Sequence, residues 1–193
     1  MRKLCLLFLL IGTYCYAGEK KYTVDSPDGK IQLAIIQTDA GELTYQLSVK
    51  HKQVIDASAL GFKTEDGLTF PFRGWKMGKV TRNKVNSVWK PLWGKRAVVP
   101  DKYNEMKLSF VNEAKSSDAL EVVARAYNEG VAFRYVSPQD AGSALELTTF
   151  NFAGDYTAWF YNGERHNIGP ERLTETDGER LPVMTVKAAD DLY

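Results

Sequence analysis

Residues 30–50 of the chain read KIQLAIIQTDAGELTYQLSVK, and this stretch decides the fold class. Apolar residues recur at every second position from Ile31 to Ile35 and again from Leu43 to Val49. An alternation with a period of two places those residues on one face of a β-strand. Asp39-Ala40-Gly41 lies between the two runs and supplies turn residues. The stretch therefore predicts a β-hairpin with one buried face.

The same pattern of short strands and turns continues along the rest of the chain. The turn Ser26-Pro27-Asp28-Gly29 precedes the hairpin, because Pro fixes φ and Gly accepts a left-handed conformation. His51 falls in a polar turn that follows the second strand. No segment after the N-terminus holds a long helical period, so the sequence predicts an all-β fold, a β-sandwich. Further strands are expected at residues 54–55, 60–62, 68–72, 106–111, 120–127, 131–136, 145–152, 156–160 and 181–186, with Leu192-Tyr193 as the start of another.

The N-terminus has the layout of a secretory signal peptide. Arg2 and Lys3 precede a short apolar run, LCLLFLLI, and Ala17 is a small residue at the expected cleavage position. We expect residues 1–17 to be removed and residues 18–193 to form the domain. Both cysteines, Cys5 and Cys15, lie in the leader, so we expect no disulfide in the exported chain. A periplasmic location, or one on the bacterial outer surface, is the expectation.

Charge excludes one class of partner. Removal of the leader takes two of the 25 basic residues and leaves 23 against 24 acidic ones, with no long run of either sign. Binding of nucleic acid requires a basic surface that releases counterions. We therefore expect no nucleic-acid partner, and the apolar run of the leader is too short to span a bilayer. A neutral partner such as a sugar fits this balance.

Two segments carry residues suited to a site. Residues 158–171, AWFYNGERHNIGPE, combine aromatic, carboxylate and amide groups around two glycines and a proline, which makes them a candidate functional loop or a plain polar surface loop. His166 and Asn167 are the candidates there for hydrogen bonds to sugar hydroxyls. The second segment, residues 88–105, contains Trp89 and Trp93. One interpretation is that these tryptophans form a platform on which sugar rings stack, with Trp93 as the candidate. The other is that they plug the end of the sandwich. We favour the plug, because an exposed Trp is energetically costly.

A series of motifs resembles family 97 of the glycoside hydrolases. The stretch WKPLWG at residues 89–94 followed by YNEM at 103–106 is similar to Trp-x-Pro-Val-Trp-Gly and Tyr-Asn-Glu-Leu in that family. Residues 125–135, RAYNEGVAFRY, resemble its Arg-x-x-Asn-Asp-Gly-Leu-Gly-Phe-Arg-Tyr hairpin. The opening SPDG at 26–29 and the closing ADDLY at 189–193 also fit, and the motifs occur in the family's order over nearly all of residues 18–193.

The resemblance implies an N-terminal β-super-sandwich of the galactose-mutarotase type, which packs on a C-terminal (β/α)8 catalytic barrel. Family members are exo-acting enzymes on α-glucoside or α-galactoside oligosaccharides, and their catalytic carboxylates lie on the barrel. The resemblance therefore implies no catalytic residue in these 193 residues. It also implies a calcium ion at the active site, with one ligand from a glutamate on an N-domain loop. Glu171 is the matching residue here, and Glu164 is the alternative.

The expected function is that of the sugar-contacting N-terminal domain of a secreted exo-α-glycosidase. Because Leu192-Tyr193 reads as the start of a strand, we expect the sandwich to be incomplete at its C-terminal end. A free-standing sugar-binding or mutarotase-like module with the same fold is the alternative. A mutarotase requires a general acid and a general base that converge, typically His and Glu, and His51 and His166 are the only histidines.

Overall fold

The computed structural model describes residues 19–65, 67, 69–71, 74–113, 119–137, 142–161, 163, 166–176, 178 and 181–193. The expected signal peptide at residues 1–17 lies outside this set. Within it the chain forms strands and a single 3-10 turn, η1 (Leu173–Glu175), which confirms the all-β prediction. No described helix is long and apolar enough to cross a membrane.

The N-terminal third of the chain forms the first sheet. Its strands are β1 (Lys20–Asp25), β2 (Ile31–Gln37), β3 (Leu43–Val49) and β4 (Lys52–Ala59), in the order β1-β2-β3-β4 and all antiparallel. The predicted hairpin is β2–β3. Lys50 and His51 connect β3 to β4 with φ values of 49° and 64°, so both residues adopt the left-handed conformation of a two-residue hairpin turn.

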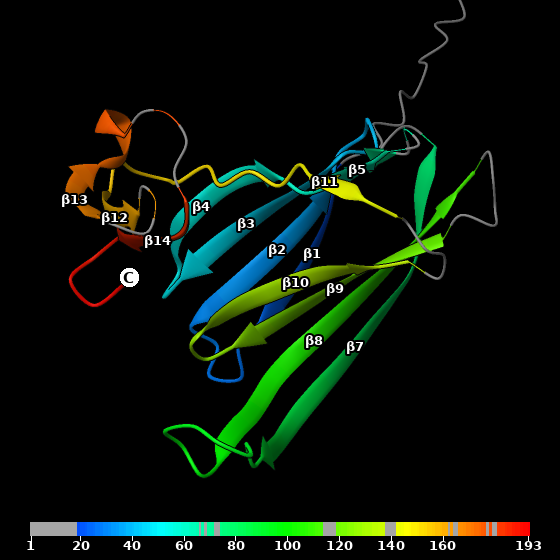
Figure 1. Ribbon diagram of the computed structural model, residues 1–193. Coiled ribbons are helices and arrows are strands. Elements are labelled where there is room, and N and C mark those ends of the chain that lie inside the picture. The colour runs from blue at the N-terminus through cyan, green and yellow to red at the C-terminus, as the bar shows by residue number, and fades with distance from the viewer. Residues whose placement is uncertain are drawn as a thin grey trace, which may run out of the picture.

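The second sheet lies opposite the first (Figure 1). It has the order β10-β9-β8-β7 and is also antiparallel. The predicted strands at residues 120–127 and 131–136 are β9 and β10. β8 is far longer than the strand expected at 106–111, and β7 was not expected. The bounds are β7 (Trp75–Trp89), β8 (Val99–Asn112), β9 (Ala119–Tyr127) and β10 (Gly130–Val136).

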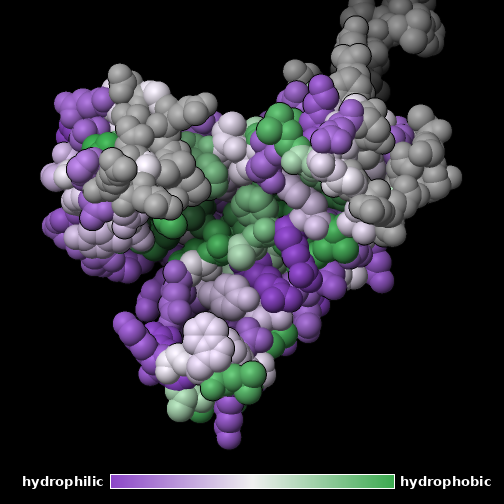
Figure 2. Space-filling model, viewed as in Figure 1, coloured by the Kyte–Doolittle hydropathy of each residue, from purple (hydrophilic) through white to green (hydrophobic). Residues whose placement is uncertain are grey.

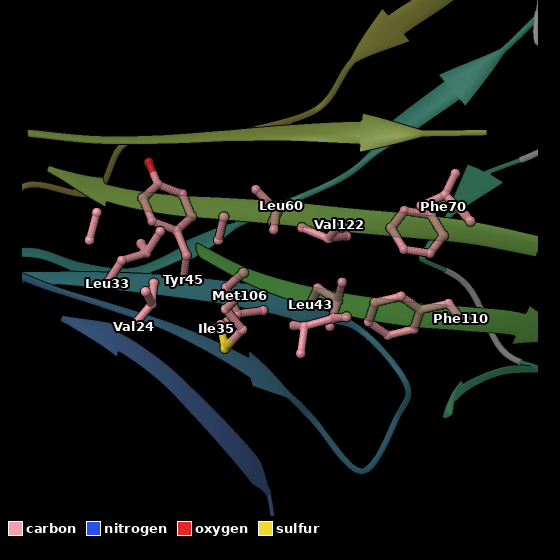
Figure 3. Close-up of a cluster of buried hydrophobic side chains, with 14 of the residues drawn as sticks. Val24, Leu33, Ile35, Leu43, Tyr45, Leu60, Phe70, Met106, Phe110 and Val122 are labelled. Carbon is pink, nitrogen blue, oxygen red and sulfur yellow. The ribbon is translucent and has the colours of Figure 1, made fainter. Parts of the chain in front are cut away.

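The core lies between the two sheets, as Figure 3 shows. Alternate residues of β2 and β3 face alternate residues of β8 and β9, as the sequence period requires. Phe70 and Phe110 are fully buried, with ring centroids 5.3 Å apart. Tyr45 is also buried, and burial raises the pKa of its phenol to about 12. The inward-facing residues include Val24, Leu33, Ile35, Leu43, Met106, Leu108, Leu120, Val122, Ala124 and Ala126.

Two smaller sheets lie at opposite ends of the sandwich (Figure 1). At one end, β5 (Phe62–Thr64) pairs with β6 (Thr69–Phe70) and with β11 (Ala144–Glu146). At the other end, the order is β13-β12-β14, and the bounds are β12 (Thr157–Tyr161), β13 (Asn167–Arg172) and β14 (Leu181–Lys187).

The segment between the two ends, residues 147–153, runs along β4, and we call it the strap. The backbone N–H of Leu147 donates to Gly61 O, that of Thr149 to Ala59 O and that of Ala153 to Val54 O. The strap therefore covers the edge of the first sheet that β4 would otherwise expose.

Leu192-Tyr193, where the start of a strand is expected, are the last two residues of the sequence. Leu192 forms a bridge with Ala189, and the residues between them make a turn in which Asp190 pairs with Lys187. Two adjacent aspartates favour a turn over a strand because their side chains bond the local backbone and neighbouring cations. The strand that Leu192-Tyr193 would begin stays a prediction.

Candidate functional site

Where residues 158–171 are described, they form the two paired strands of a β-hairpin, in place of the loop expected from the sequence. β12 and β13 pair from Thr157–Arg172 to Tyr161–Asn167, with an irregularity between the Ala158–Glu171 and Phe160–Ile168 pairs. The irregularity inserts an extra residue into β13, around Gly169, whose φ is 117°. Because Gly169 lacks a side chain, its backbone can approach Ala158 and Trp159 more closely than a Cβ atom would allow.

The bulge decides which predicted site residues share a face. Residues directly opposite each other in an antiparallel pair point to the same side of the sheet. Glu171 lies opposite Ala158 and shares a side with the buried Phe160, whereas Asn167 lies opposite Tyr161 on the other side. The hairpin therefore presents Asn167 and Glu171 on opposite faces. His166 is exposed just before β13, and Glu164 lies outside the described residues.

A hydrogen-bonded cluster fixes the backbone next to Glu171. The Nε of Arg172 donates to Asp155 Oδ2 at 2.6 Å, and both the backbone N–H and the hydroxyl of Thr174 donate to the same carboxylate at 3.0 Å. These hydrogen bonds, that of Arg172 first, hold the pKa of Asp155 below its usual value. Asp155 and Arg172 were not predicted as site residues, because they are 17 positions apart and no sequence motif links them.

The fit of calcium to this region depends on Glu171. A carboxylate is the ligand type that calcium prefers, and Glu171 is half-buried on a fixed strand. Among the described residues, no group of three or more His, Cys, Asp and Glu side chains lies close enough to hold a metal ion. Glu171 thus supplies one ligand of the type that calcium prefers, and the described part of the chain holds no complete metal site.

Trp93 lies far from the β12–β13 hairpin. It belongs to the turn between β7 and β8, at the bottom of Figure 1, and its side chain is 87% exposed. Trp89, at the end of β7, is 54% exposed. The interpretation of these tryptophans as a plug of the sandwich was wrong within the described structure, because neither ring is buried. The structure does not bring Trp93 together with His166, Asn167 or Glu171.

The other motif residues form a cluster on the outer face of the second sheet. Arg125 Nε donates to Glu105 Oε2 at 2.8 Å, and the guanidinium group lies 4.3 Å from the centroid of the Tyr103 ring. Tyr103 and Tyr127 are neighbours, with ring centroids 5.0 Å apart. Burial raises the pKa of the Tyr103 phenol. The charged groups of Arg125 and Glu105 bond to each other across the two strands, so the cluster links β8 to β9.

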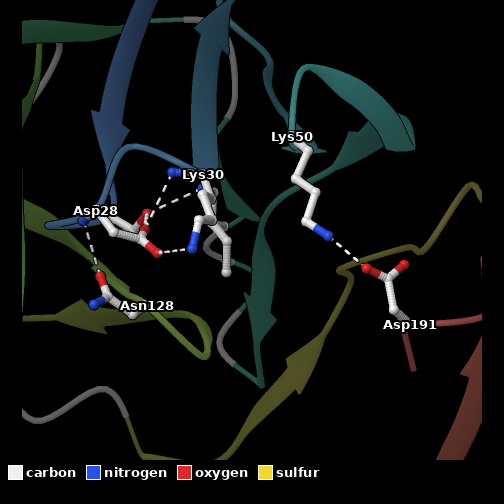
Figure 4. Close-up of polar contacts among 7 residues, drawn as sticks. Asp28, Lys30, Lys50, Asn128 and Asp191 are labelled. Atoms are coloured by element: carbon white, nitrogen blue, oxygen red, sulfur yellow. Dashed lines mark hydrogen bonds and ion pairs between the residues drawn. The ribbon is translucent and has the colours of Figure 1, made fainter.

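The SPDG turn is tied to the second sheet (Figure 4). Asp28 accepts hydrogen bonds from Ser26 Oγ at 2.6 Å and from the backbone N–H of Lys30 at 3.1 Å. The backbone N–H of Asp28 donates to Asn128 Oδ1 at 3.0 Å, and Asn104 Nδ2 donates to Asp25 O at 2.7 Å. The motif residues of both sheets therefore meet at one end of the sandwich, where they have a structural role.

Comparison with proteins of known sequence finds a family model and curated relatives that match most of this chain. The family model described as "Glycosyl-hydrolase 97 N-terminal" matches residues 24–187. A retaining alpha-galactosidase of Bacteroides thetaiotaomicron is 23% identical over 94% of this chain and 29% of its own length. A probable retaining alpha-galactosidase of Streptomyces bingchenggensis is 29% identical over 83% of this chain and 26% of its own length. The chain thus spans little more than a quarter of these curated relatives.

Solved structures give the same result. A Glycoside Hydrolase Family 97 enzyme from Pseudoalteromonas sp. strain K8, solved with panose and with acarbose, is 34% identical, with a TM-score of 0.64 over 72% of this chain and 22% of that chain. A beta-arabinopyranosidase is 26% identical, with a TM-score of 0.60 over the same shares. With the family model matching most of its length, the chain belongs to the N-terminal domain family of the family 97 glycosyl hydrolases.

Proposed function

We propose that this chain is the N-terminal domain of a secreted, exo-acting α-glycosidase whose catalytic barrel lies in another part of a longer protein. The observation that carries the proposal is the family match over residues 24–187, in a chain that covers 26% to 29% of relatives named as glycosidases. The described residues supply a rigid sandwich and a fixed hairpin, β12–β13, and they contain no metal-binding cluster. The role assigned to them is to shape one side of a sugar site.

α-Galactosides are the substrate class that we favour. The two curated relatives described above are named as a retaining alpha-galactosidase and a probable one. α-Glucosides are the second class, because the Pseudoalteromonas enzyme was solved with panose and acarbose. A retaining enzyme places its two carboxyl groups about 5 to 5.5 Å apart, so that one of them attacks the anomeric carbon directly. We assign those carboxyl groups to the barrel.

Within this scheme Glu171 contributes a carboxylate ligand to a calcium ion at the barrel's active site. A bound calcium ion supplies positive charge that polarises an oxygen of the substrate or orients a catalytic carboxylate. Asp155 and Arg172 support this role, because their ion pair holds the backbone at Glu171 in place. His166 and Asn167 remain candidates for contacts with sugar hydroxyls, and periplasmic export through residues 1–17 belongs to the same proposal.

The activity test uses the full-length protein encoded by the gene. We expect hydrolysis of p-nitrophenyl α-D-galactoside or α-D-glucoside, with the first-formed sugar in the α configuration by proton NMR. The 193-residue chain alone should hydrolyse neither compound. Absence of α-glycoside hydrolysis by the full-length protein would refute the proposal. Interconversion of galactose anomers by the 193-residue chain would favour the free-standing mutarotase-like alternative.

The calcium role is tested separately, by affinity. We expect Glu171→Gln to weaken calcium binding to the full-length protein by at least roughly tenfold, measured by titration calorimetry. Loss of a residue that only hydrogen-bonds a metal ligand already weakens binding by about that factor, and loss of the ligand itself should cost no less. Glu129→Gln, at an exposed glutamate in the turn between β9 and β10, is the matched control and should bind calcium normally. Loss of affinity in Glu164→Gln but not in Glu171→Gln would transfer the role to Glu164.

A further inference from the structure

The hairpin of β7 and β8 extends well beyond the rest of its sheet. β9 ends at Tyr127, which pairs with Tyr103, so residues 99–102 of β8 pair only with β7. The two strands nevertheless remain in register as far as the Trp89–Val99 pair. Figure 1 shows this end of the hairpin projecting from the sandwich, and we call residues 86–102 the arm.

The tip of the arm exposes large apolar side chains. Leu92 is 100% exposed and Trp93 87%, and Val88, Trp89 and Val98 are each at least 45% exposed. Figure 2 shows apolar and pale residues gathered at this tip, at the bottom of the view. Clustered apolar groups on a projecting element mark an interaction surface, and Trp is among the residues most enriched where binding energy concentrates.

The charge of the arm narrows the choice of partner. The arm carries four cations, Lys90, Lys95, Arg96 and Lys102, against one carboxylate, Asp101, and the charged residues of the turn itself are all cations. Two copies that met tip to tip would bring these cations together, which is unfavourable. A neutral sugar would stack on the tryptophans but would gain little from Leu92, Val98 or the cations. The surface fits a protein partner with an apolar recess surrounded by carboxylates.

We propose that the arm docks this domain onto the catalytic portion of the full-length glycosidase, where Leu92, Trp93 and Val98 occupy an apolar recess and Lys90, Lys95 and Arg96 face carboxylates. The inference rests on the proposed function, because it assigns the partner to the same polypeptide. The tip lies at a different end of the fold from β13 (Figure 1). The proposed role of Glu171 already places β13 against the barrel. Docking through the arm adds a second contact between the domain and the barrel, and two separated contacts fix the orientation of β13.

The test compares the double variant Leu92→Ser/Val98→Ser in two contexts, the full-length protein and the 193-residue chain. This variant leaves both tryptophans in place, so stacking of a sugar is preserved while apolar docking is lost. In the full-length protein we expect the N-terminal domain to melt separately and at a lower temperature by calorimetry, and the linker between the domains to be cut several-fold faster by protease. In the 193-residue chain the melting temperature should not change, because both side chains are exposed.

Two further variants complete the design. Leu145→Ser, at a 65% exposed leucine of β11 near the opposite end of the sandwich, is the matched control and should behave as wild type. The triple variant Lys90→Glu/Lys95→Glu/Arg96→Glu should uncouple the domains as the serine variant does, because it places like charges across the interface.

The outcomes separate the two proposals. A full-length protein that hydrolyses α-glycosides but keeps wild-type melting and protease resistance in the serine variant overturns the docking inference and leaves the proposed function intact. The inference is also overturned if domain coupling is unchanged while Trp93→Ala abolishes binding of an α-galactoside oligosaccharide, or of phosphatidylglycerol vesicles, to the 193-residue chain. A full-length protein without glycosidase activity refutes the proposed function itself.

Discussion

Arg125 and Glu105 form an ion pair across β8 and β9, with Arg125 Nε 2.8 Å from Glu105 Oε2 and the Glu105 side chain only 7% exposed. Lys107 Nζ lies 3.8 Å from the other oxygen of the same carboxylate. The Arg125 side chain is 32% exposed, and its guanidinium group also covers the Tyr103 ring. The pair thus replaces the water that a carboxylate on an open sheet face would otherwise bind.

Removal of the Glu105 charge should destabilise the domain. We expect Glu105→Gln to lower the free energy of unfolding by about 1 to 3 kcal/mol, because it leaves a partly buried guanidinium without its counter-ion. Urea unfolding followed by circular dichroism measures the change. Glu113→Gln is the matched control, since Glu113 pairs with Lys76 at the surface and an exposed pair contributes no more than about 1 kcal/mol. Equal losses in both variants would contradict the prediction.

Asp28 should make stability depend on pH in the acid range. Its hydrogen bond from Ser26, then that from the Lys30 backbone, lowers the pKa of the carboxyl group from 3.8 to about 2. A lowered pKa in the folded state stabilises the fold fully above the unfolded value, and this contribution is lost as the pH falls through about 4 toward 2. Asp28→Asn should therefore be less stable than wild type at pH 6, and the two should converge near pH 2.

Urea titrations between pH 2 and pH 6 provide the measurement for Asp28. Asp39→Asn, in the next turn along the chain, is the matched control and should follow the wild-type curve. Asp155 and Asp191 also have lowered pKa values, so some acid dependence will remain in Asp28→Asn. A constant difference between wild type and Asp28→Asn from pH 6 to pH 2 would show that the carboxylate does not titrate as described.

Gly61 should tolerate no side chain. A Cβ atom there would overlap the carbonyl oxygen of Phe70 and lie 2.9 Å from Cδ of Pro71. We expect Gly61→Ala to destabilise the domain by about 1 to 3 kcal/mol, the usual effect of overpacking. At Gly130 no atom lies within 4 Å of such a Cβ atom, so Gly130→Ala should change stability by less than about 0.5 kcal/mol. Thermal unfolding of the two variants, which carry the same chemical change, tests the difference.

Phe110 and Val111 are consecutive on β8 but face opposite sides of the sheet. Phe110 is fully buried, whereas Val111 is 38% exposed. Phe110→Ala should cost about 3 to 5 kcal/mol, because it removes apolar contacts and leaves a cavity, and Val111→Ala should cost less than about 1 kcal/mol. Chemical denaturation provides both values. A small loss at Phe110 would mean that the two sheets collapse to fill the cavity.

The alternation of apolar residues predicted the sandwich well where one face of a strand is buried. Ile31 to Ile35 and Leu43 to Val49 form β2 and β3, and residues 120–136 contain β9 and β10. The same reasoning missed β7, because most of Trp75–Trp89 is exposed on both faces and carries no alternation. It also assigned no strand to residues 99–105. Pro100 is compatible with a strand there because β8 has only one neighbour at that point.

The candidate site was less predictable than the fold. The sequence identified residues 158–171 as chemically dense, but it could not show that an extra residue near Gly169 separates the faces of Asn167 and Glu171. A bulge arises from the pairing of two strands, and the residues of one strand alone do not specify it. The exposure of Trp93 could not be predicted from the sequence either, because the same residues would be buried at the end of the sandwich if the β7–β8 hairpin were shorter.

The strap has a consequence for the order in which the chain can fold. Tyr45 Oη donates to Thr149 O and Asn151 N–H donates to Ser58 Oγ, contacts that join residues 104 and 93 positions apart. During synthesis the first sheet therefore keeps its apolar face open until β8 and β9 arrive, and its β4 edge open until residues 147–153 follow. Chains with such long-range strand pairing fold slowly and pass through aggregation-prone intermediates. The chain is therefore expected to be most prone to aggregation before residues 147–153 pair with β4.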